Sequence, residues 1–224
     1  MSKHLSALMA LPVLACSALA NAAPALYATG PAEDSAFIRF VNASPAPLEV
    51  VAQPGQAPLR LEAAQPVSLL FPVDSSKPVK GTLVSGGQKL PIDLKIEPSE
   101  FVTVFAVPDG AGIQQAVVRE PENDFNALKA SLAFFNVDAS CADAALLAAG
   151  RNAELFKSVP VNTAQRRLIN PVQLSVQLVC ANANVGAALD LGQLKAGERY
   201  SVMLVPSASG PRLLHATDTV LKSN

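Results

Sequence analysis

The chain has 224 residues, of which 50% are hydrophobic and 16% charged, and its formal net charge at pH 7 is −1. Its 18 prolines and 12 glycines are spread along the sequence, which excludes two long helices and favours many short strands joined by tight turns. Residues 23–122 carry seven Lys or Arg against eleven Asp or Glu, and residues 123–224 carry nine against seven. Neither half is basic enough for nucleic-acid binding.

The first 22 residues indicate a secretory signal. A positively charged start precedes an apolar run over 5–20, and Ala-Asn-Ala at 20–22 is a small-x-small cleavage site. The run is too short for a membrane-spanning helix. We therefore expect export and a mature chain that begins at Ala23. An alternative is that Val-Leu-Ala-Cys at 13–16 is a lipoprotein box, with Cys16 as the lipidated N-terminus.

Alternating apolar residues predict a series of strands in the first half. Residues 23–34 are expected to form a loose arm or an edge strand. Beyond them, Ile38 and Phe40 share one face of a strand, and Arg39 points the other way. The predicted strands are 35–42, 48–52, 67–71, 82–84, 90–96, 101–107 and 113–119. The predicted strand 101–107 is nearly all apolar, which predicts burial on both of its faces.

An acidic stretch with a proline, residues 120–128, is predicted to link two domains. In the second half, residues 172–178 alternate strictly, which predicts a strand with one solvated face. Residues 142–150 are ambiguous, because their alanines favour a helix that ends at Gly150. Their counterpart in the first half, 48–55, has the pattern of a strand. We predict a strand in both places, since sheet context often overrides propensity.

The opening strand of the first half occurs again at 130–137. Aligning Asn42 with Asn136 separates the two copies by 94 residues, and further matches follow in the same order. An internal duplication explains such collinear matches. With several short strands in each half, it predicts an all-β protein with two tandem β-sandwich domains, 35–119 and 129–224.

Two cysteines, Cys141 and Cys180, remain if Cys16 leaves with the signal. In an oxidising compartment, an even pair indicates one disulfide. It would close a loop of about 40 residues and stabilise the fold by about 4 kcal/mol on the chain-entropy model. The alternative is a pair of free buried thiols.

The sequence lacks the residues that serine-hydrolase chemistry requires. His215 is the only histidine of the expected mature chain, and neither Gly-x-Ser-x-Gly nor the Gly-Asp-Ser block of cell-surface sugar esterases occurs. We interpret His215 as an ordinary strand-face residue. One histidine cannot supply a zinc or copper site, and no EF-hand or phosphate-binding glycine loop is present. We therefore predict no catalytic residue, metal or cofactor. Glycan cleavage by paired carboxylates stays open, although Asp93, Glu97 and Glu100 have the pattern of solvated strand ends.

Sugar-binding sandwiches usually present exposed Trp or Tyr side chains. This chain has no Trp, and its only tyrosines are Tyr27 and Tyr200. Tyr200 aligns with an inward strand position and is expected in the core. One basic cluster could contact a partner or a polyanion, or its arginines could simply be solvated in a loop. Its members are Arg151, Lys157, Arg166 and Arg167.

Leu26-Tyr27, followed by Asp34-Ser35-Ala36-Phe37-Ile38-Arg39-Phe40-Val41-Asn42-Ala43, resembles the start of mature members of the AlgF family of alginate biosynthesis proteins. The export signal, the length, the Phe101-Val102-Thr103-Val104 strand and the duplicated halves agree with it, so the resemblance spans essentially the whole mature chain. It implies a periplasmic component of alginate O-acetylation in Gram-negative bacteria. The implied partners are a membrane-bound O-acyltransferase and periplasmic acetyltransferases of the serine-esterase type.

The resemblance and the missing triad together imply a non-catalytic adaptor that joins catalytic partners. No functional residue is transferred from the family, because the matching positions are core and turn positions. Two other classes stay open. One is an exported polysaccharide-binding module that contacts alginate weakly, and the other is an acetyl carrier or transferase.

Overall fold

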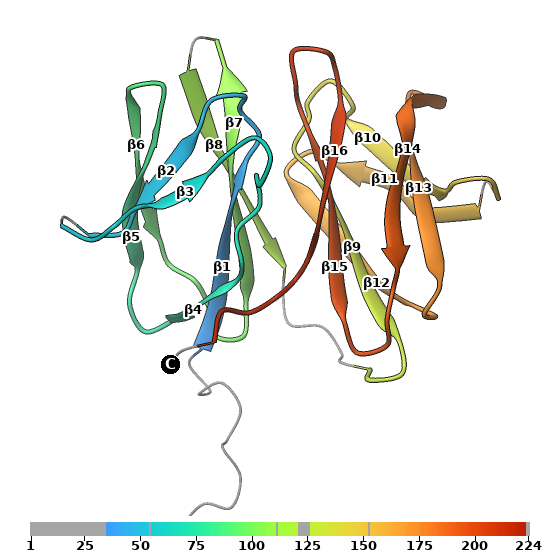
Figure 1. Ribbon diagram of the computed structural model, residues 1–224, viewed down its shortest axis with the longest axis horizontal. Coiled ribbons are helices and arrows are strands. Elements are labelled where there is room, and N and C mark those ends of the chain that lie inside the picture. The colour runs from blue at the N-terminus through green and yellow to red at the C-terminus, as the bar shows by residue number, and fades with distance from the viewer. Residues whose placement is uncertain (1–34, 54, 111, 121–125, 152, 223–224) are drawn as a thin grey trace, which may run out of the picture. The chain divides into compact units, whose positions relative to one another are not determined.

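The computed structural model describes residues 35–222, apart from residues 54, 111, 121–125 and 152 (Figure 1). The predicted signal, the lipoprotein box, the N-terminal arm with Tyr27 and most of the predicted linker lie outside the described residues. All regular secondary structure in the described part of the chain is β, with sixteen strands in four four-stranded sheets. The predicted all-β class is confirmed.

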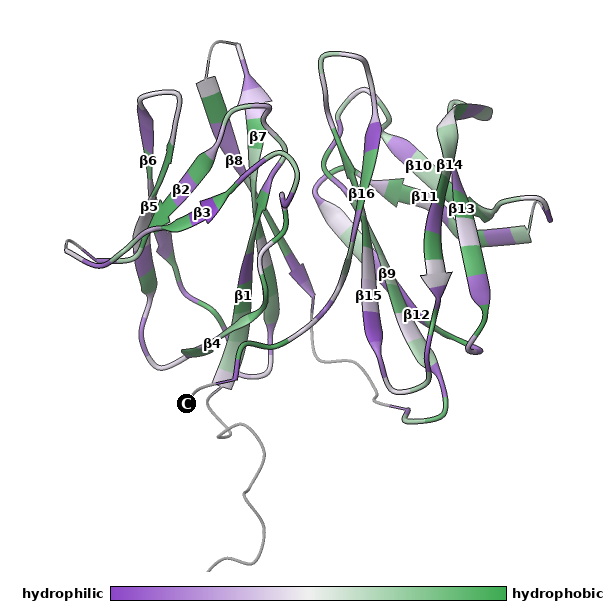
Figure 2. Ribbon diagram, viewed as in Figure 1, coloured by the Kyte–Doolittle hydropathy of each residue, from purple (hydrophilic) through white to green (hydrophobic). Residues whose placement is uncertain are grey.

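The first half of the chain forms one β-sandwich. Its strands are β1 (Ser35–Asn42), β2 (Leu48–Val51), β3 (Leu59–Leu61), β4 (Phe71–Asp74), β5 (Val79–Ser85), β6 (Gln88–Leu94), β7 (Phe101–Asp109) and β8 (Gly112–Glu120). One sheet has the order β4-β1-β7-β8, and the other has the order β3-β2-β5-β6. A buried apolar cluster that includes Ile38, Leu48 and Leu83 fills the space between them. Hydrophilic residues lie along β5 and β6 (Figure 2).

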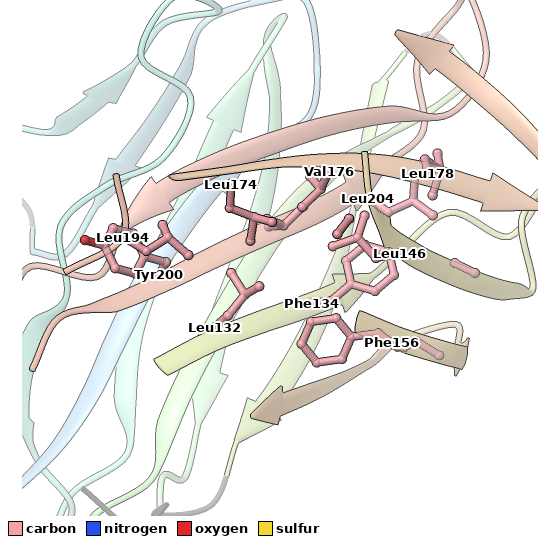
Figure 3. Packing of buried hydrophobic residues seen from close by; sticks show 14 of the residues in the cluster. Leu132, Phe134, Leu146, Phe156, Leu174, Val176, Leu178, Leu194, Tyr200 and Leu204 are labelled. Atoms are coloured by element: carbon pink, nitrogen blue, oxygen red, sulfur yellow. The ribbon is translucent and has the colours of Figure 1, made fainter. Parts of the chain in front are cut away.

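The second half forms another sandwich. Its strands are β9 (Ala130–Asn136), β10 (Asp143–Ala148), β11 (Ala153–Pro160), β12 (Thr163–Ile169), β13 (Gln173–Cys180), β14 (Ala183–Gln193), β15 (Arg199–Val205) and β16 (Arg212–Thr217). The sheet orders are β12-β9-β15-β16 and β11-β10-β13-β14. Side chains from both sheets meet in the core, where the rings of Phe134 and Phe156 lie 5.9 Å apart (Figure 3).

The two sandwiches have the same topology. Replacing each of β1 to β8 by its counterpart from β9 to β16 converts the sheet orders of the first domain into those of the second. In both, the opening strand runs antiparallel to one neighbour and parallel to the other: β1 with β4 and β7, and β9 with β12 and β15. The duplication predicted from the sequence is confirmed.

A buried asparagine ends the opening strand of each domain, at Asn42 and Asn136. The Asn42 side-chain amide donates to the carbonyl oxygens of Ala46 and Leu61, at 2.8 and 3.1 Å. Its oxygen accepts from the amide of Ser44 at 3.0 Å. The equivalent partners in the second domain, at 2.8, 2.9 and 3.0 Å, are the carbonyl oxygens of Cys141 and Val159 and the amide of Asp138. Each asparagine therefore fixes the first turn of its sandwich.

Replacing either asparagine by alanine is expected to lower the free energy of unfolding by about 1–3 kcal/mol, because buried backbone groups lose their partners. The two losses should be similar, since the bonds are equivalent. Urea denaturation of Asn42→Ala and Asn136→Ala measures both, with Asn184→Ala, at an exposed position of β14, as the control. An effect no larger than that of the control would refute the shared role.

The alanine-rich segment forms strand β10, as predicted. Ala144, Leu146 and Ala148 are buried and alternate with more exposed residues. The strand pairs with β11 on one side and β13 on the other. A central position in a sheet outweighs the helix propensity of alanine, because burial of alternate side chains rewards the extended conformation.

One predicted strand, 67–71, is wrong in position. Val67 makes only an isolated bridge to Val41, and β4 begins at Phe71. Between them, the hydroxyl of Ser68 accepts a hydrogen bond from the amide of Phe40 at 2.9 Å, which replaces a ladder contact. Leu70 instead pairs with Val220 in the C-terminal tail. Local alternation could not reveal a partner 150 residues away.

Candidate functional site

The two sandwiches belong to one compact unit, Pro31–Asn224. They pack through the faces of sheets β4-β1-β7-β8 and β12-β9-β15-β16 that point away from their own cores. The buried members of this contact are Val41, Ala43, Phe105, Val107, Val118, Ala133, Phe135, Val137, Met203 and Val205. The rings of Phe105 and Phe135 lie 6.0 Å apart across the interface. This contact explains why β7 is buried on both faces, as its sequence predicted.

Arg39 of β1 crosses the interface from the first domain. Its Nη1 donates to Asp218 Oδ1 at 2.6 Å, and its Nη2 donates to Ser201 Oγ at 2.8 Å. Its Nε donates to Thr103 Oγ1, in its own domain, at 2.9 Å. The guanidinium also lies 5.0 Å from the centre of the Phe135 ring. One side chain thus anchors the first domain to β15 and to the segment after β16.

Arg166 of β12 crosses in the opposite direction. Its Nε donates to Glu120 Oε1, at the end of β8, at 2.8 Å. Its Nη2 donates to Asp218 Oδ2 at 2.9 Å, so Asp218 binds both arginines. The four charged side chains Arg39, Glu120, Arg166 and Asp218, which we call the interdomain ion network, are each at most 6% exposed. The network contains two positive and two negative charges.

The chain continues from Asp218 back to the first domain (Figure 1). The amide of Leu70 donates to the carbonyl of Thr219 at 2.9 Å, and the amide of Leu221 donates to the carbonyl of Leu70 at 2.8 Å. The C-terminal tail therefore adds a short parallel bridge to the domain that the N-terminal half builds. Backbone pairing and ion pairing hold the two domains together at the same place.

Opposite charges shift the pKa values of Asp218 and Arg166. Burial alone would raise the pKa of Asp218, but Arg39 and Arg166 outweigh burial and hold that pKa below its ordinary value. Burial likewise opposes the charge of Arg166, yet Glu120 and Asp218 raise its pKa. Both residues are therefore charged at neutral pH, as a structural ion pair requires.

The lowered pKa of Asp218 predicts loss of stability in acid. Its contribution to folding is fully present above the ordinary aspartate pKa of 3.8, and it is lost as pH falls through the lower folded-state pKa. We expect the urea midpoint of unfolding to fall steeply below about pH 4, and we expect the Asp218→Asn variant to show a shallower fall. Urea titrations from pH 6 to 2.5 test it, with Asp93→Asn, an exposed position, as the control. If the urea midpoint of Asp218→Asn falls in acid as steeply as that of the wild type, Asp218 is not the cause of the loss.

A third arginine, Arg199, lies beside the network. Its guanidinium stacks over the ring of Phe101 in the first domain, 4.4 Å from the ring centre. Burial lowers the pKa of Arg199, and repulsion from Arg166 lowers it further. The stacking supplies a cation–π contact across the interface.

The basic cluster predicted from the sequence is divided by the structure. Arg166 belongs to the interdomain ion network and is buried, so it is not available to a partner or a polyanion in this arrangement. Arg167, the next residue along β12, lies opposite Leu132 on the core-facing side of this edge strand. Its side chain is exposed at the edge of the sandwich, where Nη1 donates to the carbonyl of Leu155 at 2.7 Å. Lys157 on β11 and Arg151 in the preceding turn are also exposed. Arg166 and Arg167 do not lie in a loop, because both belong to strand β12.

The remaining sequence-based predictions concern single residues. Cys141 and Cys180 form a disulfide, which connects the β9–β10 loop to the end of β13. Tyr200 is in the core, as predicted, and its hydroxyl donates to Glu198 Oε2 at 2.5 Å. His215 is an exposed residue of β16, which fits its interpretation as a strand-face residue. Asp93 lies on an exposed strand face.

The residues that sequence reasoning missed are Arg39, Glu120 and Asp218. Arg39 carried a usable signal, because it is a lone charge between apolar residues of a strand. Glu120 and Asp218 carried a second signal, since they are 98 residues apart at matching places in the duplicated halves. Recognising these signals required the assumption that the domains contact each other, which no local pattern provides.

A groove of about 710 Å³ lies where loops of the two domains meet. It is lined by Ala43, Ser44, Pro45, Ala46, Pro108, Gly110, Gly112, Pro206, Ser207, Ala208, Ser209 and Arg212. The small side chains leave it open, and Arg212 is its only charged residue among those described. The hydroxyl of Ser207 donates to the carbonyl of Gly210 at 2.6 Å and so serves the loop itself.

These features define an all-β protein in which two duplicated sandwiches are joined by a buried ion network. The described residues contain no group of three or more His, Cys, Asp or Glu side chains placed to hold a metal, and within them no helix could cross a membrane. The chain belongs to the AlgF family, since the family model described as "Alginate O-acetyl transferase AlgF" matches residues 6–201. The protein therefore has a role in alginate O-acetylation. The family and the disulfide together indicate an extracytoplasmic protein.

Two solved structures are similar to parts of this chain. The C-terminal domain of AlgF from P. aeruginosa is 23% identical, with a TM-score of 0.34, and the match covers 40% of this chain and 98% of that one. The TIE protein of Bacillus anthracis is 10% identical, with a TM-score of 0.26, and the match covers 75% of this chain and 33% of that one. No curated protein matches the chain.

Proposed function

We propose that this protein is a non-catalytic periplasmic adaptor that links a membrane-bound O-acyltransferase to the periplasmic acetyltransferases of alginate O-acetylation. Family membership supports the pathway. The observation that supports the adaptor role is the interdomain ion network, because it uses four buried charged side chains to hold two domains together. A chain that fixes two domains as one body presents two surfaces at a constant separation.

A fixed separation favours simultaneous binding of two partners. When one partner docks, the second surface is already held in place, so the second binding event loses less freedom than between separate molecules. The outer sheets β3-β2-β5-β6 and β11-β10-β13-β14 are the candidate surfaces, since each lies on the far side of its own core from the interface. Two weak contacts on such a body combine into one stronger attachment.

The two outer surfaces differ in charge. On the first, Arg60 pairs with Glu49 and Glu62, so its charges are largely matched. On the second domain, Lys157 is exposed on β11, the edge strand of the outer sheet, and Arg167 is exposed on β12, the edge strand of the other sheet of the same sandwich. We assign these two residues, with Arg151, to an acidic patch on a partner acetyltransferase.

Pull-down of purified periplasmic acetyltransferases tests the adaptor role. We expect the wild-type protein to retain an acetyltransferase, and Lys157→Glu/Arg167→Glu to weaken retention about tenfold, because like charges would face each other. Lys89→Glu, at an exposed position on β6, is the matched control. If no acetyltransferase is retained and a strain that lacks this protein acetylates alginate normally, the adaptor role is refuted.

The groove between the domain loops favours a second candidate, a polysaccharide-binding module. Its size suits an extended chain, and Arg212 could pair with a uronate carboxylate. Titration with short alginate oligosaccharides distinguishes the candidates, since binding that Arg212→Gln abolishes would support this one. The transferase alternative predicts instead that the purified protein transfers acetyl groups to an oligosaccharide acceptor.

A further inference from the structure

The groove between the domain loops takes its walls from both sandwiches. The β1–β2 loop and the β7–β8 turn of the first domain line it together with the β15–β16 loop of the second. The β7–β8 and β15–β16 connections occupy equivalent places in the two duplicated sheets. The groove also continues the buried interdomain contact, because Ala43 belongs to both. It therefore exists only while the two domains are held together.

Arg212, the first residue of β16, lies on the groove side of its sheet. In the ladder with β15 it pairs with Val205, which is buried in the interdomain contact. Directly opposite residues of paired strands lie on the same face, so Arg212 lies on the face that meets the first domain. Leu214 and Ala216 follow at alternate positions and pack against the same contact. The strand register thus agrees with the place of Arg212 in the groove lining.

The guanidinium of Arg212 has an unsatisfied donor. Arg39 and Arg166, on the same interdomain surface, both bind carboxylates. The Nε of Arg212 is buried, yet no described residue accepts a hydrogen bond from it. A buried donor without an acceptor costs free energy, and a group that binds beside it explains such a donor. The fold does not require an arginine here, since the counterpart 98 residues earlier is the uncharged Gln114.

The rest of the lining favours a polypeptide over a polysaccharide, although the size of the groove suits either chain. Apart from Arg212, the lining residues are all alanine, proline, glycine or serine. They offer no aromatic ring on which a sugar could stack and no side-chain amide or carboxylate for its hydroxyl groups. An extended peptide needs less, because its main chain supplies many of the hydrogen bonds and small lining residues let it approach closely. One guanidinium then matches one carboxylate.

We propose that this groove binds an extended polypeptide segment of a partner protein, with an Asp or Glu carboxylate of that segment paired to Arg212. The proposal rests on the adaptor role and adds a docking place to the two outer sheets. A segment bound here contacts both domains at once. It therefore favours the joined arrangement of the domains, because it binds only that arrangement.

Binding of a purified periplasmic acetyltransferase, measured by biolayer interferometry, tests the site. We expect Arg212→Gln to weaken binding about tenfold, and Arg212→Lys to weaken it less, because lysine keeps the charge without the forked geometry. The glutamine variant has the residue type of Gln114 at this position and breaks no ion pair, so its urea midpoint of unfolding should not fall. Lys77→Gln, at an exposed position after β4 and outside the groove, is the matched control for charge removal.

Photocrosslinking identifies the segment that docks. A photoreactive amino acid in place of Ser209, an exposed residue of the groove, should capture an acetyltransferase segment that contains Asp or Glu. The same amino acid in place of Asn182, exposed in the turn after β13, should not capture that segment. Changing the captured carboxylate residue to lysine should weaken binding to the wild type, and Arg212→Glu should then restore it.

Three results would overturn the proposal, and they separate it from the adaptor role. If the acetyltransferase binds Arg212→Gln as tightly as the wild type, the groove is not the docking place, and the adaptor role stands on the outer sheets. If short alginate oligosaccharides compete with the acetyltransferase for the groove, the occupant is a sugar chain. If the wild type binds no acetyltransferase, both the site and the adaptor role are refuted.

Discussion

Replacing Asp218 by alanine is expected to lower the free energy of unfolding by about 3–5 kcal/mol, the usual cost of removing one partner from a buried ion pair. Asp218 is the only residue that binds both Arg39 and Arg166 in the described structure, so its loss leaves Arg39 without a carboxylate partner. Urea denaturation measures the loss. In a thermal scan, the same change should lower Tm by about 10 °C for a protein of this size.

Two controls separate the network from general sensitivity to charge removal. Asp93→Ala removes an exposed partner of Lys80 and should cost at most about 1 kcal/mol. The double variant Arg39→Met/Asp218→Leu replaces the buried pair by apolar groups, and it should recover most of the stability, since a buried pair is often no better than an apolar contact. If Asp218→Ala is as mild as Asp93→Ala, the ion network does not hold the domains together.

The fold could be predicted from the sequence where the signal is local or repeated. Period-2 alternation predicted β6 and β13, and the recurrence of Asn42 as Asn136 predicted two domains of one topology. The duplication also corrected a misleading propensity, because the strand pattern of 48–55 indicated that the alanine-rich β10 is a strand. Repeats carry more information than single segments, since the second copy tests the interpretation of the first.

The candidate site could not be predicted in the same way, because its contacts join distant residues. Arg39 and Asp218 are 179 positions apart, and Arg166 and Glu120 are 46 apart. A lone arginine on a strand normally indicates a solvated face, and the adjacent Arg166 and Arg167 indicated a basic surface. Arg39 and Arg166 are structural because the other domain buries the faces of β1 and β12 that point away from the cores. Only the contact between domains turns these charges into structural ion pairs.

The interface also bears on the proposed adaptor role. Two domains on a flexible linker would sample many separations, and the gain in binding a second partner would fall with linker freedom. Here the apolar contact, the ion network and the C-terminal tail act on the same pair of domains. We therefore expect variants that weaken the network to lower stability and to uncouple the binding of two partners, even where each outer surface is intact.

Reducing the Cys141–Cys180 disulfide is expected to lower the free energy of unfolding by about 4 kcal/mol, because the open chain regains the entropy of a loop of about 40 residues. Urea curves with and without dithiothreitol measure the change. The Cys141→Ala/Cys180→Ala variant should have the stability of the reduced protein and should not respond to reductant. The first domain has Ala46 and Ser85 at the corresponding positions and folds without a cross-link. A loss below about 1 kcal/mol on reduction would therefore show that the second sandwich, like the first, does not depend on a cross-link.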